Sequence, residues 1–334
     1  MDSSKFLITG CAGFIGFHLA KMLIKKGYFV VGIDNLNNYY DVNLKKGRLK
    51  YLKKNSKKKF IFKKIDLSDE KKLKKLFKYY KFKTVINLAA QAGVRHSLVK
   101  PKSYIKSNLI GFFNILQVCK NHKIPHLIYA STSSVYGNSK KFPIKESAET
   151  SKPLQLYAAT KKSNELMAEC YSNLYNMRIT GLRFFTVYGP WGRPDMALSI
   201  FTRSIIKKKP VSVFNYGNHE RDFTYVEDIA NGITKLINSK NFSKANAGKH
   251  RVYNLGNNKP ISLKKYITLI ENNLKIKAKK IYKPLQPGDV KKTHSSSNLA
   301  KKDFGFLPTT NPETGIKKFI NWYKNYYGTK KNKI

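Results

Sequence analysis

The residue types and spacing that best suit chemistry are those of Tyr157 and Lys161, which stand four positions apart. On a helix such residues share one face, so the phenol and the ammonium can reach the same ligand. An isolated tyrosine has a pKa of about 10 and is a poor base at neutral pH. Because a nearby lysine cation and the positive charge of a nicotinamide stabilise the phenolate and lower this pKa, the pair predicts a tyrosine base assisted by a lysine. A surface Tyr–Lys pair without a function is the alternative.

A second group of reactive types is the hydroxyl-rich segment at the end of a predicted strand, Leu127–Ser131. Its consecutive residues are Ser131, Thr132, Ser133 and Ser134. Hydroxyls at the carboxyl end of a strand can hold a substrate hydroxyl and relay its proton to Tyr157. The segment therefore predicts a partner for the tyrosine, with an ordinary serine-rich turn as the alternative.

A glycine-rich turn joins the first predicted strand, Phe6–Thr9, to the first predicted helix, Phe14–Lys26. Glycine lets the backbone approach a pyrophosphate, which then lies at the positive end of the helix. The spacing GxxGxxG is weak evidence by itself, because tight turns also need glycine. The residues predicted to hold a dinucleotide here are Gly10, Gly13, Phe14, Ile15 and Gly16.

Acidic and small residues at the ends of later strands indicate which dinucleotide would bind. Asp34 ends the predicted strand Phe29–Ile33 and is placed to bind an adenosine ribose, where a carboxylate would repel a 2′-phosphate. NAD is therefore favoured over NADP, and a plain turn residue is the alternative. Asp66, after the predicted strand Phe60–Phe62, is expected to accept from the adenine edge. The other predicted cofactor contacts are Asn35, Leu67, Ala89, Ala90, Gln91, Asn108, Ser131, Tyr157 and Lys161. Asn108 is expected to bind main-chain groups near the nicotinamide, and an ordinary polar residue of a helix is the alternative.

β-rich runs alternate with helical runs through the first half of the chain. The further predicted strands and helices are Thr84–Leu88, Ile179–Phe184, Asp69–Tyr80, Tyr104–Asn121 and Tyr157–Tyr175. This alternation predicts an α/β fold, a doubly wound parallel Rossmann sheet with helices on both faces. We expect an NAD-binding domain over 1–182, rejoined by segments near 223–258, and a smaller, interleaved substrate domain over 183–330.

The net charge of +46 is the unusual bulk property of this 334-residue chain. A nucleic-acid or acidic-membrane surface is one interpretation. Lysine-biased surface composition is the favoured one, because only eight of the 65 basic residues are arginines, which nucleic-acid readers prefer. We therefore expect no specific nucleic-acid partner.

Targeting and metal signals are missing from the sequence. No apolar run approaches the roughly 18 residues of a membrane span, and no signal peptide is recognised, so we expect a cytoplasmic protein without membrane insertion. The three cysteines are widely spaced and the seven histidines lack the spacing of metal ligands. Reduced cysteines and no metal are expected.

Taken together, these motifs resemble the extended short-chain dehydrogenase/reductase family, and within it the UDP-glucuronate 4-epimerases. The likeness runs from Phe6 to about Tyr327. The stretches that carry it are Gly32–Asp41, Ala89–Arg95, Leu182–Ala197, Arg221–Asp228 and Gln286–Val290. One departure is His96, because the family commonly has a tyrosine at this place.

The resemblance implies a tightly bound NAD and a C4 epimerisation of a UDP-hexuronic acid, from UDP-glucuronate to UDP-galacturonate, through a transient 4-keto sugar. Tyr157 would take the proton of the C4 hydroxyl, Thr132 would position that hydroxyl, and Lys161 would hold the nicotinamide ribose. Relatives that dehydrate or decarboxylate the sugar carry Asp-Glu or Ser-Glu in the loop after Thr132. Ser133 and Ser134 stand there in this chain, which favours return of the hydride to C4.

The resemblance also implies a set of substrate contacts. Arg193 is expected to face the sugar carboxylate, and its alternative is an ion pair with Asp195. Arg221 is expected to bind the diphosphate, and its alternative is an ion pair with Asp222. Phe184 is expected to line the nicotinamide face. The full substrate-binding prediction is Thr132, Ser133, Ser134, Thr186, Arg193, Arg221 and, for the uridine ribose, Asp289.

Assembly and two rival functions are also open to the sequence. Relatives dimerise by pairing the helices that correspond to Tyr104–Asn121 and Tyr157–Tyr175 into a four-helix bundle, so a homodimer is expected. Packing on the sheet alone is the other interpretation of their apolar stripes. The rival functions are a 4-epimerase of another UDP-hexose, such as UDP-N-acetylglucosamine or its uronate, and a basic nucleic-acid-binding protein on a Rossmann frame.

Overall fold

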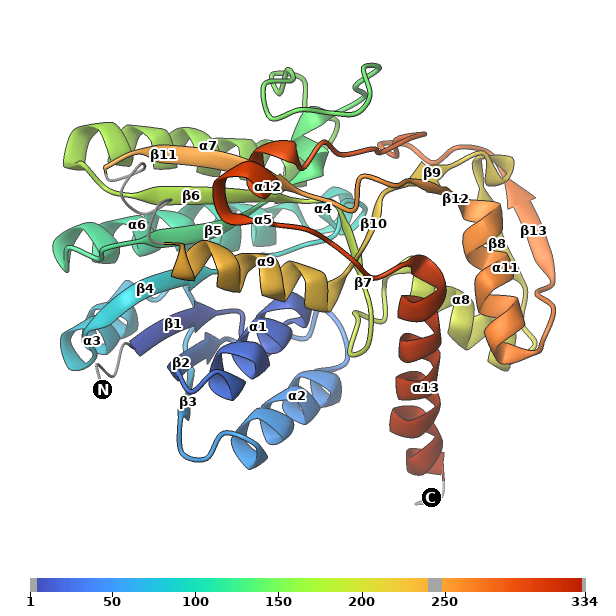
Figure 1. The fold of residues 1–334 in the computed structure, drawn as a ribbon, viewed down its shortest axis with the longest axis horizontal. Coiled ribbons are helices and arrows are strands. Elements are labelled where there is room, and N and C mark those ends of the chain that lie inside the picture. The colour runs from blue at the N-terminus through green and yellow to red at the C-terminus, as the bar shows by residue number, and fades with distance from the viewer. Residues whose placement is uncertain (1–4, 240–247, 332–334) are drawn as a thin grey trace.

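The computed structural model describes residues 5–239 and 248–331, and Figure 1 shows its elements around a central sheet. The sheet has seven parallel strands in the order β11-β6-β5-β4-β1-β2-β3. Their bounds are β1 (Lys5–Thr9), β2 (Phe29–Asp34), β3 (Phe60–Lys64), β4 (Phe82–Asn87), β5 (Leu127–Thr132), β6 (Ile179–Phe184) and β11 (His250–Leu255). The chain winds outward from β1 in both directions, so the predicted doubly wound Rossmann sheet is confirmed.

Helices cover both faces of this sheet. Successive residues of a strand point to opposite faces, so each face has its own apolar core beneath the helices. On β1, Phe6 and Ile8 pack into one core and Leu7 packs into the other. The first core contains α1 (Phe14–Lys25), α2 (Val42–Lys54), α9 (Val226–Asn238) and α12 (Asn298–Phe304). The second contains α3 (Glu70–Tyr79), α6 (Gly111–Asn121) and α7 (Leu156–Tyr175).

One predicted helix, Tyr104–Asn121, differs from the structure. Short α4 (His96–Val99) and α5 (Pro101–Tyr104) lead into a π-helical stretch, η1 (Ile105–Ile110), before regular α6 begins. A π-turn is wider than an α-turn and is common beside functional sites. The apolar period predicted the helical span correctly, but it could not predict the local change of hydrogen-bonding pattern.

A second group of elements lies beyond the sheet, on the right of Figure 1. Its helices are α8 (Ala197–Ile206), α11 (Leu263–Leu274) and α13 (Pro312–Lys331). Its strands pair as β7 (Thr186–Tyr188) with β10 (Phe223–Tyr225), β8 (Val211–Phe214) with β13 (Lys280–Lys283), and β9 (Glu220–Arg221) with β12 (Ile261–Ser262). A separate core that includes Phe201, Tyr266 and Phe319 holds this group together.

The chain passes between the two groups more than once. After β10 it forms α9, which packs against α1, and then β11, which pairs with β6 through Leu255 and Phe184. The second half of the sequence therefore completes the first sheet. The domain boundaries at 182 and 183 stay predictions. Within the described ranges no helix combines the length and the hydropathy that crossing a bilayer requires.

Candidate active site

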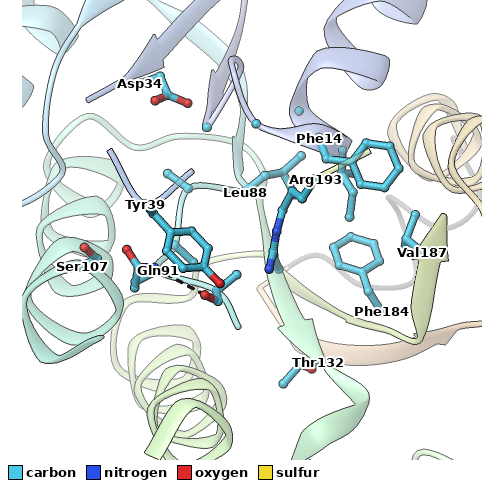
Figure 2. A pocket seen from close by; sticks show the side chains of 18 of the residues that line it. Phe14, Asp34, Tyr39, Leu88, Gln91, Ser107, Thr132, Phe184, Val187 and Arg193 are labelled. Carbon is cyan, nitrogen blue, oxygen red and sulfur yellow. Dashed lines mark hydrogen bonds between the residues drawn. The ribbon is translucent and has the colours of Figure 1, made fainter. Parts of the chain in front are cut away.

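A cavity of about 360 Å³ opens at the carboxyl ends of the central strands, where the strand order reverses between β1 and β4. Ligands of doubly wound folds bind at this place. Figure 2 shows this cavity with Asp34, Thr132 and Arg193 on its walls. The predicted site residues that line it are Gly10, Gly13, Phe14, Ile15, Gly16, Asp34, Asn35, Asp66, Leu67, Ala89, Ala90, Gln91, Ser131, Thr132, Ser133, Ser134, Tyr157, Lys161, Phe184, Thr186 and Arg193.

The turn between β1 and α1 is built for close backbone approach. Gly10 has a φ of +70°, and a Cβ there would lie 2.8 Å from the main-chain nitrogen of Ala89. At Gly16 a Cβ would collide with the carbonyl oxygen of Gly10. No side chain caps the first turn of α1, whose N-cap residue is Gly13. Its free N–H groups and the absence of side chains suit a diphosphate, so the residues fit a dinucleotide.

Asp34 stands at the end of β2 in the wall of the same cavity. Its carboxylate Oδ1 accepts a 2.8 Å hydrogen bond from the main-chain N–H of Leu36. Burial raises the pKa of this carboxyl, while the charge of Lys45 opposes the shift. Asp66 lies nearby and accepts a 2.9 Å hydrogen bond from the Asn35 amide. Both acids therefore face the part of the cavity that would hold an adenosine.

Tyr157 and Lys161 reach the cavity from the first two turns of α7. The Tyr157 phenol is partly buried, and the Thr132 hydroxyl lies near it. Burial raises the pKa of Tyr157, and this effect outweighs the hydrogen bond from Thr132 and the charge of Arg193. Without a cofactor, loss of water around the phenol therefore dominates, and the lowered pKa expected beside Lys161 and a nicotinamide cation stays a prediction.

Lys161 is also buried, and its ammonium donates a 3.2 Å hydrogen bond to the side-chain oxygen of Asn164. Burial lowers the pKa of Lys161 to about 8, although the charge of Glu165 opposes the shift. A buried lysine with so few partners is costly to keep. Its position in the cavity wall fits a group that is held for a ligand rather than for the fold.

A buried ion pair fixes the hydroxyl-rich segment against α7. Arg183 donates from Nε and Nη2 to the two carboxylate oxygens of Glu165 at 2.8 and 2.7 Å. Ser131 donates to the same carboxylate at 2.6 Å, and Arg183 also donates to the Tyr136 hydroxyl at 2.8 Å. Thr132, directly after Ser131, is thereby held close to Tyr157 on the neighbouring helix.

Asn108 has a different place from the other predicted cofactor contacts, because it does not line the cavity. It lies in the π-helical stretch, accepts a 2.8 Å hydrogen bond from the N–H of Gln91 and donates a 3.0 Å hydrogen bond to the Gln91 carbonyl. Its own carbonyl accepts a 2.7 Å hydrogen bond from Asn164. Asn108 thus ties the loop after β4, which does line the cavity, to α7.

Arg193 projects into the cavity from the loop before α8, and Figure 2 shows its guanidinium beside Tyr39. It donates from Nε and Nη2 to the Asp195 carboxylate at 3.0 and 2.6 Å. The ion pair named as an alternative in the sequence is therefore present. Arg193 lines the cavity all the same, so the pairing and a role toward a ligand are compatible.

Arg221 and Asp289 lie together but outside this cavity. Arg221 donates a 2.8 Å hydrogen bond to the Asp289 carboxylate and a 2.6 Å hydrogen bond to the carbonyl of Val290. Asp222 instead accepts from the main-chain N–H of Asn257 at 2.7 Å. Arg221 therefore pairs with Asp289 rather than with Asp222, and the structure joins these two predicted residues to each other but not to the rest.

Several cavity residues carry no role in the sequence prediction: Tyr39, Tyr40, Lys45, Ser107, Val187 and Met196. Tyr39 and Tyr40 belong to a stretch that carries the family resemblance, and that was the available signal. The unexpected His96 packs against Tyr39 with ring centroids 4.5 Å apart. No cluster of three or more metal-ligating side chains occurs within residues 5–239 and 248–331.

Comparison with known proteins places this geometry in a family. The model of the GDP-mannose 4,6-dehydratase family matches residues 7–319. Protein CapI of Staphylococcus aureus is 49% identical over 97% of this chain and 99% of its own length. UDP-glucuronate 4-epimerase 4 of Arabidopsis thaliana is 44% identical over 97% of this chain and 76% of its own length.

Among solved structures, the UDP-glucuronic acid 4-epimerase of Bacillus cereus, in complex with UDP-glucuronic acid and NAD, superposes with a TM-score of 0.90. It is 33% identical and covers 97% of this chain and 100% of its own. These comparisons confirm the predicted relationship, the predicted enzyme class and NAD as the predicted cofactor. The chain belongs to the GDP-mannose 4,6-dehydratase family, within the extended short-chain dehydrogenases/reductases.

Proposed function

We propose that the protein inverts C4 of UDP-glucuronate to give UDP-galacturonate, through a transient 4-keto sugar and with NAD bound throughout. The observation that carries the proposal is the common cavity. Tyr157 and Thr132, an arginine suited to a carboxylate (Arg193) and the glycine turn all line it. A reversible oxidation needs a base, a dinucleotide and a held sugar within reach of one another.

NAD, when bound, supplies the acceptor of a hydride from C4 and later its donor. The glycine turn at Gly10 and Gly13 would hold its pyrophosphate, and Asp34 its adenosine ribose. Lys161 would hold the nicotinamide ribose from the cavity wall. Asn108 would act through Gln91, since its side-chain amide holds both main-chain groups of that residue.

Tyr157 removes the proton of the C4 hydroxyl in this proposal, and Thr132 positions that hydroxyl through its own. The positive charge of Lys161 and of an oxidised nicotinamide would offset the burial that raises the pKa of Tyr157. After oxidation the sugar turns about its link to the diphosphate and presents its other face. The proton then returns from Tyr157 to the C4 oxygen, and the configuration is inverted.

The residues after Thr132 favour this outcome over elimination or decarboxylation. Ser133 and Ser134 line the cavity and carry no carboxylate that could work on C5. Arg193 would bind the sugar carboxylate, which holds the acid group apart from the developing ketone. Arg221 and Asp289 would bind the nucleotide from outside the main cavity, a firm anchor that lets the sugar turn.

The direct test is to incubate the purified protein with UDP-glucuronate without added NAD and to follow the sugar by NMR. We expect UDP-galacturonate to accumulate. Tyr157→Phe should lower kcat at least about a hundredfold, because it removes the acid–base group. Tyr28→Phe, which removes a hydroxyl that donates to Asn238 far from the cavity, is the matched control. A protein that converts UDP-N-acetylglucosamine or its uronate and leaves UDP-glucuronate untouched would contradict the proposed substrate.

We also propose that the protein acts as a homodimer through the helices next to η1. Large apolar side chains are exposed there, Ile105 at 40%, Phe113 at 44% and Leu166 at 56%, on η1, α6 and α7. Such a patch fits a second copy of the same surface. Analytical ultracentrifugation at physiological salt should give the mass of a dimer for the wild type and the mass of a monomer for Leu166→Glu. A wild-type monomer at micromolar concentration would contradict this assembly.

A further inference from the structure

Arg193 has part of its hydrogen-bonding capacity committed before any ligand binds. A guanidinium carries five N–H groups, one on Nε and two on each Nη. Asp195 takes the Nε–H and one N–H of Nη2. Asp195 leaves both N–H groups of Nη1 and the second of Nη2, and the edge between Nη1 and Nη2 can hold another carboxylate with two hydrogen bonds. Asp195 therefore orients Arg193 without using the edge that a sugar acid would need.

Tyr39 completes this arrangement from the loop after β2. Its hydroxyl donates a 2.8 Å hydrogen bond to Oδ2 of Asp195, and its ring centroid lies 5.6 Å from Cζ of Arg193. The phenol thus contacts the acid while the ring packs beside the cation. Burial raises the pKa of Tyr39 to about 12, so the hydroxyl keeps its proton and stays a donor at neutral pH.

The position of Tyr39 is itself fixed by its neighbours. The ring of His96 packs against one side at 4.5 Å. Gly93 has a φ of +103°, and a Cβ there would strike the Tyr39 hydroxyl. A residue larger than glycine at 93 would displace the phenol from Asp195. Gly93 in the loop after β4 therefore leaves the space in which the Tyr39 hydroxyl reaches Asp195.

We propose that Tyr39 and Asp195 are positioning residues that hold Arg193 ready for the carboxylate of a UDP-hexuronic acid and so set the preference for acidic over neutral sugars. The inference rests on the proposed function. Its physical basis is preorganisation, since a long side chain on a loop otherwise loses rotamer freedom when the ligand binds. A neutral sugar leaves the remaining edge of Arg193 unpaired, which disfavours its binding.

The test is calorimetric titration of the NAD-loaded protein with UDP-glucuronate and, separately, with UDP-glucose. Tyr39→Phe keeps the ring and removes one oxygen atom, and Asp195→Asn keeps the shape and removes the charge. Each variant should bind UDP-glucuronate about tenfold more weakly, which is the effect of one lost hydrogen bond to a charged group. Its affinity for UDP-glucose should not change. The double variant should bind UDP-glucuronate no more weakly than Asp195→Asn alone, because the two side chains act as one unit.

The outcomes separate this inference from the proposed function. A wild-type protein that holds UDP-glucuronate no more tightly than UDP-glucose overturns the proposed substrate and the preference with it. A wild-type preference that survives in both variants overturns the role of Tyr39 and Asp195 alone. An equal loss of affinity for both ligands also overturns this role, because a general distortion of the cavity would weaken the binding of both. Tyr28→Phe should bind both sugars as the wild type does.

Discussion

The buried guanidinium of Arg48 donates a 2.6 Å hydrogen bond to the main-chain carbonyl of Trp191. It donates another, of 2.7 Å, to the carbonyl of Ala12 in the glycine turn. Trp191 stands two residues before Arg193, so one side chain of α2 supports both the turn proposed to hold NAD and the loop proposed to hold the sugar acid. The Tyr40 hydroxyl accepts a third hydrogen bond of 2.7 Å from the same group.

Arg48→Met should lower the free energy of unfolding by about 3 kcal/mol. The carbonyls of Ala12 and Trp191 would each lose a charged donor while they stay away from water. Urea unfolding of the variant and the wild type measures the change. Arg203→Met, at an exposed position of α8, is the control and should change stability little. A loss below about 1 kcal/mol for Arg48→Met would show that these bonds contribute little.

Lys161→Met should stabilise the ligand-free protein at pH 7 while it abolishes turnover. Burial lowers the pKa of Lys161 to about 8, whereas an unfolded lysine titrates near 10.4. The unfolded state therefore binds more protons between these values, and the cost of the buried charge is fully present below pH 8 and fades as the pH rises toward 10.4.

The expected gain for Lys161→Met at pH 7 is about 3 kcal/mol, and it should shrink between pH 8 and 10. Urea unfolding at pH 7 and pH 10 measures it, with exposed Lys301→Met as the control. A variant that is less stable than the wild type at pH 7 would refute the view that Lys161 is kept for the ligand at the expense of the fold.

Glu165→Gln should destabilise the protein at neutral pH by about 3 kcal/mol or more, because it leaves the Arg183 cation buried without its counter-ion. Burial by itself would raise the pKa of Glu165, but hydrogen bonding and charge from Arg183 outweigh it, and the pKa is lowered. The stabilisation is therefore present above the unfolded value of about 4.3 and is lost as pH falls through the lower folded value.

Thermal unfolding of Glu165→Gln and the wild type between pH 7 and pH 3 checks this prediction. The difference in unfolding temperature between the two proteins should become smaller as the pH falls into the acid range. Glu70→Gln breaks a surface pair with Lys74 and should have a small effect throughout. A difference that stays constant down to pH 3 would show that the charge of Glu165 is not what stabilises the pair.

Asp34→Asn should reduce the discrimination between NAD and NADP. The carboxylate at the end of β2 would repel a 2′-phosphate, and the amide of asparagine keeps the shape without the charge. After removal of bound cofactor, calorimetry should show the ratio of the two dissociation constants falling about tenfold or more. Glu70→Gln, which also removes one negative charge, serves as the control. If the ratio of the two dissociation constants did not change, the adenosine ribose would not bind beside Asp34.

Much of the fold was predictable from short stretches of sequence. The strands at Phe6–Thr9 and Ile179–Phe184 follow from local apolar patterns, and the structure has them as β1 and β6. The glycine turn and the Tyr157–Lys161 spacing were recognisable for the same reason. Helix α2 was not predicted, because its lysines hide the few buried positions, such as Leu49 and Leu52. The π-turn at Ile105–Ile110 was missed because the apolar period does not report the hydrogen-bonding pattern.

The candidate site was predictable where neighbours in sequence are also neighbours in space. Arg221 and Asp289 were both selected, yet nothing in the sequence indicated that they would pair with each other outside the main cavity. Asn108 was expected to bind main-chain groups near the nicotinamide, and its amide does bind both main-chain groups of Gln91, although Asn108 does not line the cavity. Tyr39 received no role at all, since its partner Asp195 lies 156 residues further along the chain.

The sequence by itself determined the Rossmann sheet, the glycine turn and the Tyr157–Lys161 pair, because each depends on the period and identity of contiguous residues. Only the tertiary structure decided that Arg48 joins Ala12 to Trp191, that Tyr39 holds Asp195 against Arg193, and that burial raises the pKa of Tyr157. Those relations depend on which loops meet after folding and on how much water they exclude, and neither quantity is local in the chain.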